Sequence, residues 1–192
     1  MSETPCAKGA AFHELLAVAR ATFDDRWLAA LDPETRSAFD ARPDAVVPDD
    51  RFCAALEAAT DAHPELARAV GRARAEAIVS PRVAALDGDP FRFLKEGASS
   101  FYEGRTTYGA TSVEVLGDRA ILRMVAPERF ARRPGEGPNP GPTLAAAFLG
   151  RGLELVSGLS REPRYNGPAP RIDERFDRPM VNLLFEFELD SA

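Results

Sequence analysis

The chain has 192 residues, of which 45% are hydrophobic and 28% charged, and its formal net charge is −6. This composition is typical of one ordinary globular domain and excludes a chain that is disordered throughout. The acidic balance argues against nucleic acid binding, which requires a basic surface to neutralise phosphates. No apolar run approaches the ~20 residues of a membrane span, and the N-terminus lacks the features of a signal peptide. We therefore expect a cytoplasmic protein.

The first half of the chain is predicted to be helical. Between Ala10 and Phe23, apolar residues recur at intervals of three and four, which indicates one buried helical face. Asp32-Pro33 predicts the N-cap and first residue of a short helix, and Asp49-Asp50 predicts the cap of the next one. The acidic pairs in this half are interpreted as helix caps rather than as acid–base pairs.

Two further helices are predicted before the chain changes character. His63-Pro64 is expected to open a long helix that breaks near Ser80-Pro81, because proline disfavours a helical residue before it. Asp89-Pro90 then begins a helix with a single apolar stripe, made of Phe91, Leu94, Ala98, Phe101 and Tyr102.

From Gly109 onward the pattern predicts strands. Segments 111–116 and 119–126 flank Gly117-Asp118, the composition of a two-residue hairpin turn. Residues 134–142 form a Pro/Gly-rich segment that predicts a loop. An apolar helix is predicted from Thr143 to Ser157, with Gly158 as its C-terminal cap.

The last strand has the clearest pattern. Apolar residues at every second position from Val181 to Leu189 alternate with mostly polar ones, so one face is predicted to be buried and the strand to be central. Its partner is expected at 162–166, across a polar connection over 167–179. The predicted fold class is α+β: N-terminal helices followed by β-β-α-β-β, forming an antiparallel sheet covered by helices. We expect one domain over 1–192, helical over 10–105 and sheet-containing over 106–190.

The second half resembles a known family. The resemblance rests on Asp89-Pro90-Phe91, the pair Phe101-Tyr102, the hairpin over 113–122, the helix over 148–155 and the strand over 185–189. These segments are similar to an uncharacterised myxobacterial paralogous family of about two hundred residues, and more distantly to the four-vinyl-reductase and transport-particle domain. The resemblance implies a helix-covered antiparallel sheet that commonly dimerises and can hold a small hydrophobic ligand. Some of those relatives bind metal through cysteines near the final hairpin, but this sequence has none between Glu162 and Leu189.

No catalytic constellation is recognisable. Ser157 does not stand in a nucleophile elbow, and the Gly-rich loop before it is interrupted by prolines, which lack the N–H groups that bind phosphate. His13 and His63 lack the spacing of a metalloprotease helix and the apolar context of a haem ligand, and Cys6 and Cys53 lack the spacing of a metal site. We therefore predict no metal and no cofactor, and an enzyme that uses arginines and carboxylates ranks third among the functions.

The leading hypothesis is a non-enzymatic small-molecule-binding or regulatory module. An apolar pocket is expected between the last helix and the sheet, lined by Tyr102, Met124, Phe148, Phe185 and Phe187. The alternative is that these five residues simply form the core. The competing function is a dimerisation or scaffold protein without a ligand.

Two helical glycines, Gly150 and Gly152, bear on the same choice. Each costs about 1 kcal/mol of helix propensity relative to alanine, so each is expected at a close contact. That contact is with the sheet, with a ligand, or with a second copy of the chain in a homodimer.

Overall fold

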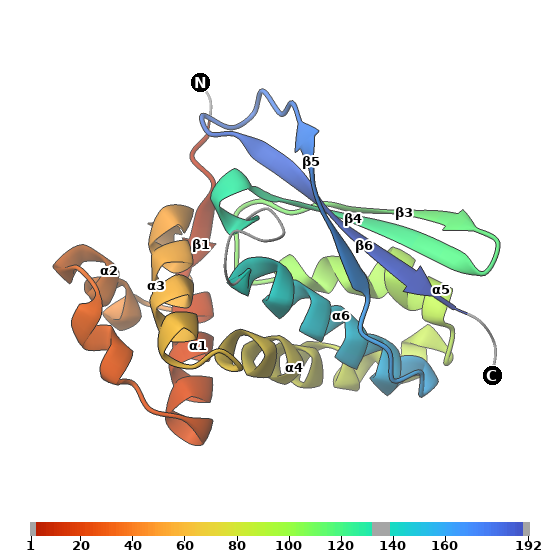
Figure 1. The fold of residues 1–192 in the computed structure, drawn as a ribbon, viewed down its shortest axis with the longest axis horizontal. Coiled ribbons are helices and arrows are strands. Elements are labelled where there is room, and N and C mark those ends of the chain that lie inside the picture. Colours follow the sequence, from red (N-terminus) through yellow and green to blue (C-terminus); the bar gives the residue numbers. More distant parts are fainter. Residues whose placement is uncertain (1–2, 132–138, 190–192) are drawn as a thin grey trace.

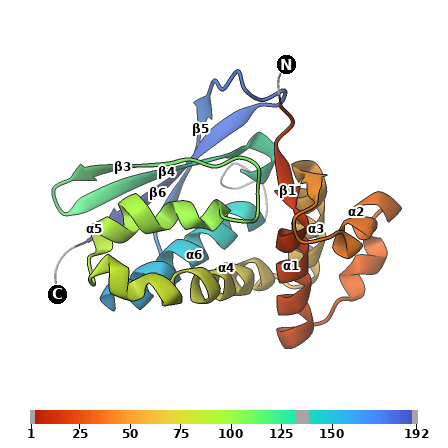
Figure 2. The same cartoon turned by 180° about the vertical axis from the view of Figure 1, so that it is seen from behind.

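A four-stranded antiparallel sheet covers a layer of helices, and the first three helices stand together at one end of that layer (Figure 1). The structure is a computed structural model that describes residues 3–131 and 139–189. Seen from behind, α5 and α4 lie under the hairpin and α6 lies deeper, closer to the centre (Figure 2). The α+β class predicted from the sequence is thereby confirmed.

The helices follow the chain in this order. The α-helices are α1 (Gly9–Thr22), α2 (Pro33–Ser37), α3 (Asp49–Ala62), α4 (Leu66–Ile78), α5 (Pro90–Arg92) and α6 (Pro140–Ser157). Short helices of other types are η1 (Arg26–Ala30), η2 (Ala38–Asp40), η3 (Ser80–Leu86), η4 (Phe93–Gly97), η5 (Ala98–Tyr102) and η6 (Glu128–Phe130).

The strands form two sheets. A small sheet pairs β1 (Cys6–Lys8) with β2 (Val46–Pro48), and the main sheet contains β3 (Thr111–Leu116), β4 (Arg119–Pro127), β5 (Arg164–Arg171) and β6 (Met180–Glu188). The order in the main sheet is β3-β4-β6-β5, with every neighbour antiparallel. The last strand is therefore central, as its alternating pattern predicts.

The alternation in β6 decides which face of the sheet is covered. Phe185 is fully buried and Leu183 nearly so, whereas the intervening Leu184 and Glu186 are partly exposed. The buried face packs on α6, which in turn packs closely on α4: a side chain at Gly71 of α4 would lie 2.2 Å from the carbonyl oxygen of Leu144. One continuous apolar core extends from Phe12 in α1 to β6.

Local signals place several helix ends. The Asp32 carboxylate accepts a hydrogen bond from the Thr35 backbone N–H, so the predicted cap of α2 is confirmed. The Asp89 carboxylate accepts from two N–H groups and caps α5, where the sequence predicted only that a helix begins. Gly158 ends α6 in the left-handed conformation, with φ 75°. The helix predicted to begin at Asp89-Pro90 is present, but it passes from α-helix through a π-helical turn into a 3₁₀ turn.

Other boundaries differ from the predictions. Pro140, Gly141 and Pro142 belong to the first turn of α6 rather than to a loop, because a proline in the first turn sacrifices no helical hydrogen bond; residues 134–138 lie outside the described ranges. The polar connection is shorter than predicted, since β5 continues to Arg171. His63 follows the end of α3, and α4 begins only at Leu66.

Within the described ranges, no helix combines the length and the apolar character needed to cross a bilayer.

Candidate functional site

The five side chains predicted to line a pocket lie at the junction between the helices and the sheet. Met124, Phe148 and Phe185 are fully buried, and Tyr102 and Phe187 are nearly so. The space beside Tyr102 is a void of about 10 Å³, which is room for about one water molecule. The structure therefore places these residues in a filled core, the alternative that the sequence left open. Phe187 differs from the others because it also lines an open groove, described below.

Contacts inside the chain account for both helical glycines of α6. A Cβ atom at Gly152 would lie 2.2 Å from the Phe93 ring, and one at Gly150 would lie 3.1 Å from the carbonyl oxygen of Arg161. The closest neighbours are thus η4 and the chain that follows α6, not the sheet. The predicted close approach is present at both positions, and neither glycine requires a second copy of the chain to explain it.

A buried ion cluster joins α1 to α4 beside the void. Arg74 donates to Glu14 from Nε at 2.8 Å and from Nη2 at 2.5 Å, and its guanidinium lies 4.8 Å from the centre of the Phe101 ring. Arg105 approaches the other Glu14 oxygen at 3.3 Å. The Arg74 side chain is 3% exposed, and its remaining Nη1 is directed at the Phe101 carbonyl. All the donors of this arginine thus face the protein itself, which is the geometry of a structural clamp.

A second buried polar group is Asp49, in the first turn of α3. Its carboxylate accepts hydrogen bonds from the Tyr108 hydroxyl at 2.7 Å and from the Cys53 thiol at 3.3 Å. Burial raises the pKa of Asp49 to about 6, although the two donors act in the opposite direction. The sequence interpretation of Asp49 as a helix cap is wrong, because its side chain is directed into the core. There it binds Tyr108, which lies 59 residues further along the sequence.

The histidines and the remaining acidic pair have local roles. The His63 ring nitrogen lies 3.1 Å from Asp24, and hydrogen bonds, chiefly from Arg26, hold the pKa of Asp24 well below its usual range. Neither His63 nor His13 lines the void or the groove. Among residues 3–131 and 139–189, no three His, Cys, Asp or Glu side chains are arranged to hold a metal ion.

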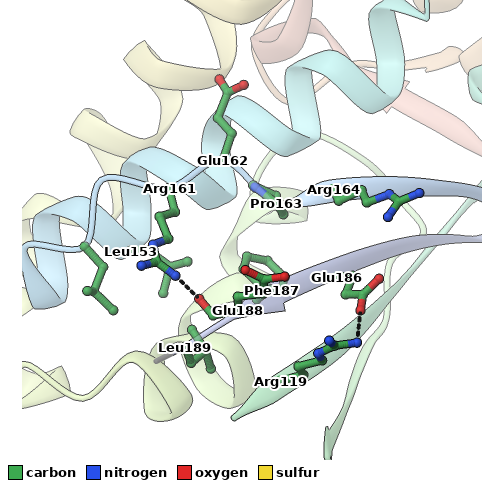
Figure 3. A pocket seen from close by; sticks show the side chains of 11 residues that line it. Arg119, Leu153, Arg161, Glu162, Pro163, Arg164, Glu186, Phe187, Glu188 and Leu189 are labelled. Carbon is green, nitrogen blue, oxygen red and sulfur yellow. Dashed lines mark hydrogen bonds and ion pairs between the residues drawn. The ribbon is translucent and has the colours of Figure 1, made fainter. Parts of the chain in front are cut away.

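A candidate site with an apolar floor is a groove at the end of β6, shown in Figure 3. Its volume is about 470 Å³, and it lies between the chain that follows α6 and the adjoining ends of β4 and β6. Its lining combines apolar and charged side chains: Leu153, Leu159, Pro163, Phe187 and Leu189 with Arg119, Arg161, Arg164, Glu162, Glu186 and Glu188. The groove is thus amphipathic.

The three arginines of the groove have a long ion pair or none with the described residues. Arg119 reaches Glu186 only at 3.5 Å, and Arg161 donates to the backbone carbonyl of Glu188 at 3.3 Å. Among the described residues, no carboxylate lies within ion-pair distance of Arg161 or Arg164. By contrast, Glu162 is directed away from the other labelled side chains in Figure 3 and pairs with Arg68 on α4. The groove therefore offers guanidinium groups without fixed counter-ions.

A second, broader depression of about 640 Å³ lies beside β5 and contains Pro168, Pro170 and Pro179. Its Arg129 pairs with Glu57 at 3.3 Å and its Arg171 pairs with Asp173 at 3.1 Å, so both of its arginines have carboxylate partners. The groove of Figure 3 is for this reason the better candidate for a polar ligand.

Sequence reasoning found only one of the groove residues, Phe187. Arg119 comes from the start of β4, Leu153 from α6, and Glu186, Glu188 and Leu189 from the end of β6; the others come from the segment 159–164, which carries no periodic pattern. The local signal was Arg161-Glu162-Pro163-Arg164, a charged segment that the sequence alone does not distinguish from a solvated loop.

Comparison with known proteins identifies the fold. An H-NOX protein from K. algicida, solved as an unliganded Fe(II) mutant, superposes with a TM-score of 0.60 over 93% of this chain and 95% of that one, at 11% sequence identity. No family model matches the chain, and no curated protein matches it in sequence. At this identity the likeness shows the fold alone.

Proposed function

We propose that this chain is a small-molecule-binding module, and that its ligand occupies the amphipathic groove at the end of β6. The ligand has an acidic group and a short apolar body. A sensory or ligand-binding role is consistent with the H-NOX fold. The observation that carries the proposal is that two arginines without a carboxylate partner among the described residues, Arg161 and Arg164, line a groove that also has apolar side chains in its lining.

The size and chemistry of the groove support this assignment. A volume of about 470 Å³ lies within the range of ~300–1,000 Å³ that is typical of small-molecule sites. Leu153 and Phe187 would contact the apolar body of the ligand. The planar guanidinium of Arg161 or Arg164 can bind a carboxylate or sulfonate through two parallel hydrogen bonds.

Binding fits the groove better than catalysis. Its lining has no serine, threonine, cysteine or histidine, so it has no side chain of the common nucleophile or general-base types apart from carboxylates. Two of those carboxylates are already engaged: Glu162 with Arg68, and Glu186 with Asn166 at 2.9 Å.

The iron named for the H-NOX neighbour does not fit the residues present here. Iron is held by cysteine thiolates in clusters, or in haem by an axial His, Cys, Met or Tyr side chain. Here Cys53 is hydrogen-bonded to Asp49, and the hydroxyls of Tyr102 and Tyr108 are hydrogen-bonded to the Val125 carbonyl and to Asp49. Met124 is packed in a core whose void of about 10 Å³ cannot admit a macrocycle.

The proposal can be tested with a dye that carries both chemical features. 1-Anilinonaphthalene-8-sulfonate gains fluorescence in apolar surroundings, and octanoate should compete with it for the groove. We expect the double variant R161Q/R164Q to bind the dye at least about tenfold more weakly, since a hydrogen bond to a charged group contributes about 1.5–3 kcal/mol. R42Q is the matched control, because Arg42 is 84% exposed and its Asp44 partner is 3.6 Å away.

The result that would overturn the proposal is equal dye affinity in the wild type and in R161Q/R164Q. Dye that binds tightly but is not displaced by octanoate would also contradict a ligand with an acidic group and a short chain.

The competing function, a dimerisation or scaffold protein, is favoured by a different feature of the molecule. That feature is the edge of the main sheet formed by β3, the edge opposite β5. It does not depend on the groove.

A further inference from the structure

The two edges of the main sheet are built differently. The edge strand β5 contains Pro168 and Pro170, and its pairing with β6 is interrupted by a bulge between Tyr165 and Pro168. Proline and bulges are the devices by which natural proteins prevent an edge strand from pairing with another chain. The other edge strand, β3, has neither: its six residues pair with β4 without interruption, and none is proline.

The outer edge of β3 presents backbone groups for further pairing. In an antiparallel pair, successive residues direct their N–H and C=O groups alternately toward and away from the neighbouring strand. The Ala110 carbonyl accepts a hydrogen bond from the Val125 N–H at 3.0 Å, which places Ala110 among the residues that face β4. By alternation, the backbone groups of Thr111, Val113 and Val115 face outward.

Apolar side chains are exposed along the same strand. Val115 is 42% exposed and Leu116 is 51% exposed, although both belong to a regular strand. The tip of the β3–β4 hairpin reaches beyond the helices in both views, so no helix covers it (Figures 1 and 2). An edge that is regular, partly apolar and uncharged except for Glu114 is the kind that pairs with another strand.

We propose that β3 pairs antiparallel with β3 of a second copy of this chain, so that two four-stranded sheets join into one. A twofold axis at Val113 places Val113 opposite Val113 of the second copy and Thr111 opposite its Val115. All three outward-facing residues of each strand are then paired. In this interface the side chain of Val115 is covered by the Thr111 end of β3 in the other copy.

Charge disfavours one of the two neighbouring registers, and the end of the strand disfavours the other. With the axis at Val113, Glu114 faces Ser112 of the second copy and remains paired with its own Arg123 at 2.8 Å. Moving the axis by one residue toward the hairpin tip would set the two Glu114 carboxylates directly opposite each other, which is unfavourable. Moving it the other way would set Val115 opposite Gly109, which lies outside the strand. The edge is therefore self-complementary in one register, which favours a second copy over an unrelated strand.

The register predicts opposite effects for two substitutions at one exposed position. S112E sets a new carboxylate opposite Glu114 twice, once on each side of the axis, and should raise the dimer Kd by roughly tenfold. S112K sets an ammonium group there and should lower the Kd by a few-fold. The measurement is sedimentation equilibrium of the full chain over a concentration series, with S160E and S160K as controls at an exposed serine outside the sheet.

Three outcomes would overturn the proposal: a wild-type protein that is monomeric throughout the series, a dimer whose Kd is unchanged by both substitutions at Ser112, or a Kd that both substitutions change in the same direction. Opposite shifts support it, because damage to the hairpin itself would weaken the dimer in both variants. Hydrogen exchange gives an independent readout, since the amides of Thr111, Val113 and Val115 should become protected as concentration rises.

Discussion

Arginines in two regions of this molecule serve different ends. At the junction between α1 and α4, Arg74 is 3% exposed and donates two hydrogen bonds to Glu14. At the end of β6, Arg161 and Arg164 line an open groove, and no described carboxylate lies within ion-pair distance of either. Arginine side chains therefore stabilise the fold in one region and remain available to bind a ligand in the other. The difference separates polar groups that stabilise this fold from those that can give it a function.

The junction also shows why the interior is an unsuitable ligand site. Aromatic rings fill it: Phe101 and Phe148 are in edge contact with their centres 5.3 Å apart, and Tyr102 donates to the Val125 carbonyl at 2.6 Å. Substitutions in this region should change stability, whereas those in the groove should change binding. The expected losses in the free energy of unfolding therefore decrease from the buried core to the open groove.

The largest effect is expected in the centre of the sheet. Phe185 is fully buried on β6, so F185A should lower the free energy of unfolding by about 3–5 kcal/mol through the lost apolar contacts and the cavity left behind. L184A, the adjacent and partly exposed position on the opposite face, is the control and should cost clearly less. Urea unfolding measures both. A near-neutral F185A would mean that the buried face of β6 is assigned incorrectly.

Neutralising Glu14, which faces Arg74, should lower the free energy of unfolding nearly as much. E14Q leaves a buried guanidinium without a counter-ion, which typically lowers stability by about 3 kcal/mol or more. The contrasting variant is E34Q, because Glu34 pairs with Arg51 at the surface and its side chain is 76% exposed; its effect should be below about 0.5 kcal/mol. Equal effects of the two variants in urea unfolding would contradict the description of the junction as a clamp.

Asp49 should make stability depend on pH. Its folded-state pKa of about 6 lies above the ordinary value of 3.8, so between these two pH values the folded state binds more protons than the unfolded state. The contribution of this group to stability is therefore fully present below about pH 4 and is lost as the pH rises through about 6. D49N should not lose stability in this way. Between pH 4 and pH 7 its free energy of unfolding, relative to that of the wild type, should therefore rise by up to about 3 kcal/mol. A constant difference between the two proteins across that range would show that Asp49 does not titrate there.

The two glycines of α6 should respond differently to alanine. G152A forces a methyl group against the buried Phe93 ring and should cost about 1–2 kcal/mol, despite its gain in helix propensity. G150A meets its neighbours at 3.1–3.2 Å and should be close to neutral. Thermal melts measure the difference, and sedimentation should show the same assembly for both variants, because both contacts are internal. A stabilising G152A would refute the contact with Phe93.

The smallest effect on stability is expected in the groove. R161Q/R164Q removes two charges without carboxylate partners among the described residues, so the free energy of unfolding should change by less than about 0.5 kcal/mol. Urea unfolding of this variant beside E14Q gives the most direct contrast between the two regions. A loss comparable to that of E14Q would assign the groove arginines a structural role.

The sequence was sufficient for elements whose signals are local or periodic. The alternation over 181–189 and the Gly117-Asp118 turn predicted β6 and the hairpin because a single face of each strand is buried. Asp49 was misassigned because a cap signal describes only neighbouring residues, whereas burial of its side chain depends on Tyr108, far along the chain. The strands β1 and β2 have three residues each, too short to show a period.

The groove could not be predicted from the sequence for a related reason. Arg119, Arg161 and Phe187 belong to three separate segments, and only the folded sheet brings them to one groove. The aromatic residues predicted to line a pocket were correctly identified as apolar and inward-facing. However, a sequence pattern does not reveal whether the space between such residues is empty or filled.

The most direct test of the central claim is an amide NMR titration of the full chain with octanoate. Binding in the groove predicts chemical-shift changes concentrated at residues 159–164 and 186–189, and their loss in R161Q/R164Q. Residues 101–108, which border the filled junction, should be unaffected. Shifts confined to 101–108, or no shifts at 159–164 at millimolar octanoate, would contradict the proposal that this groove is where the protein binds its ligand.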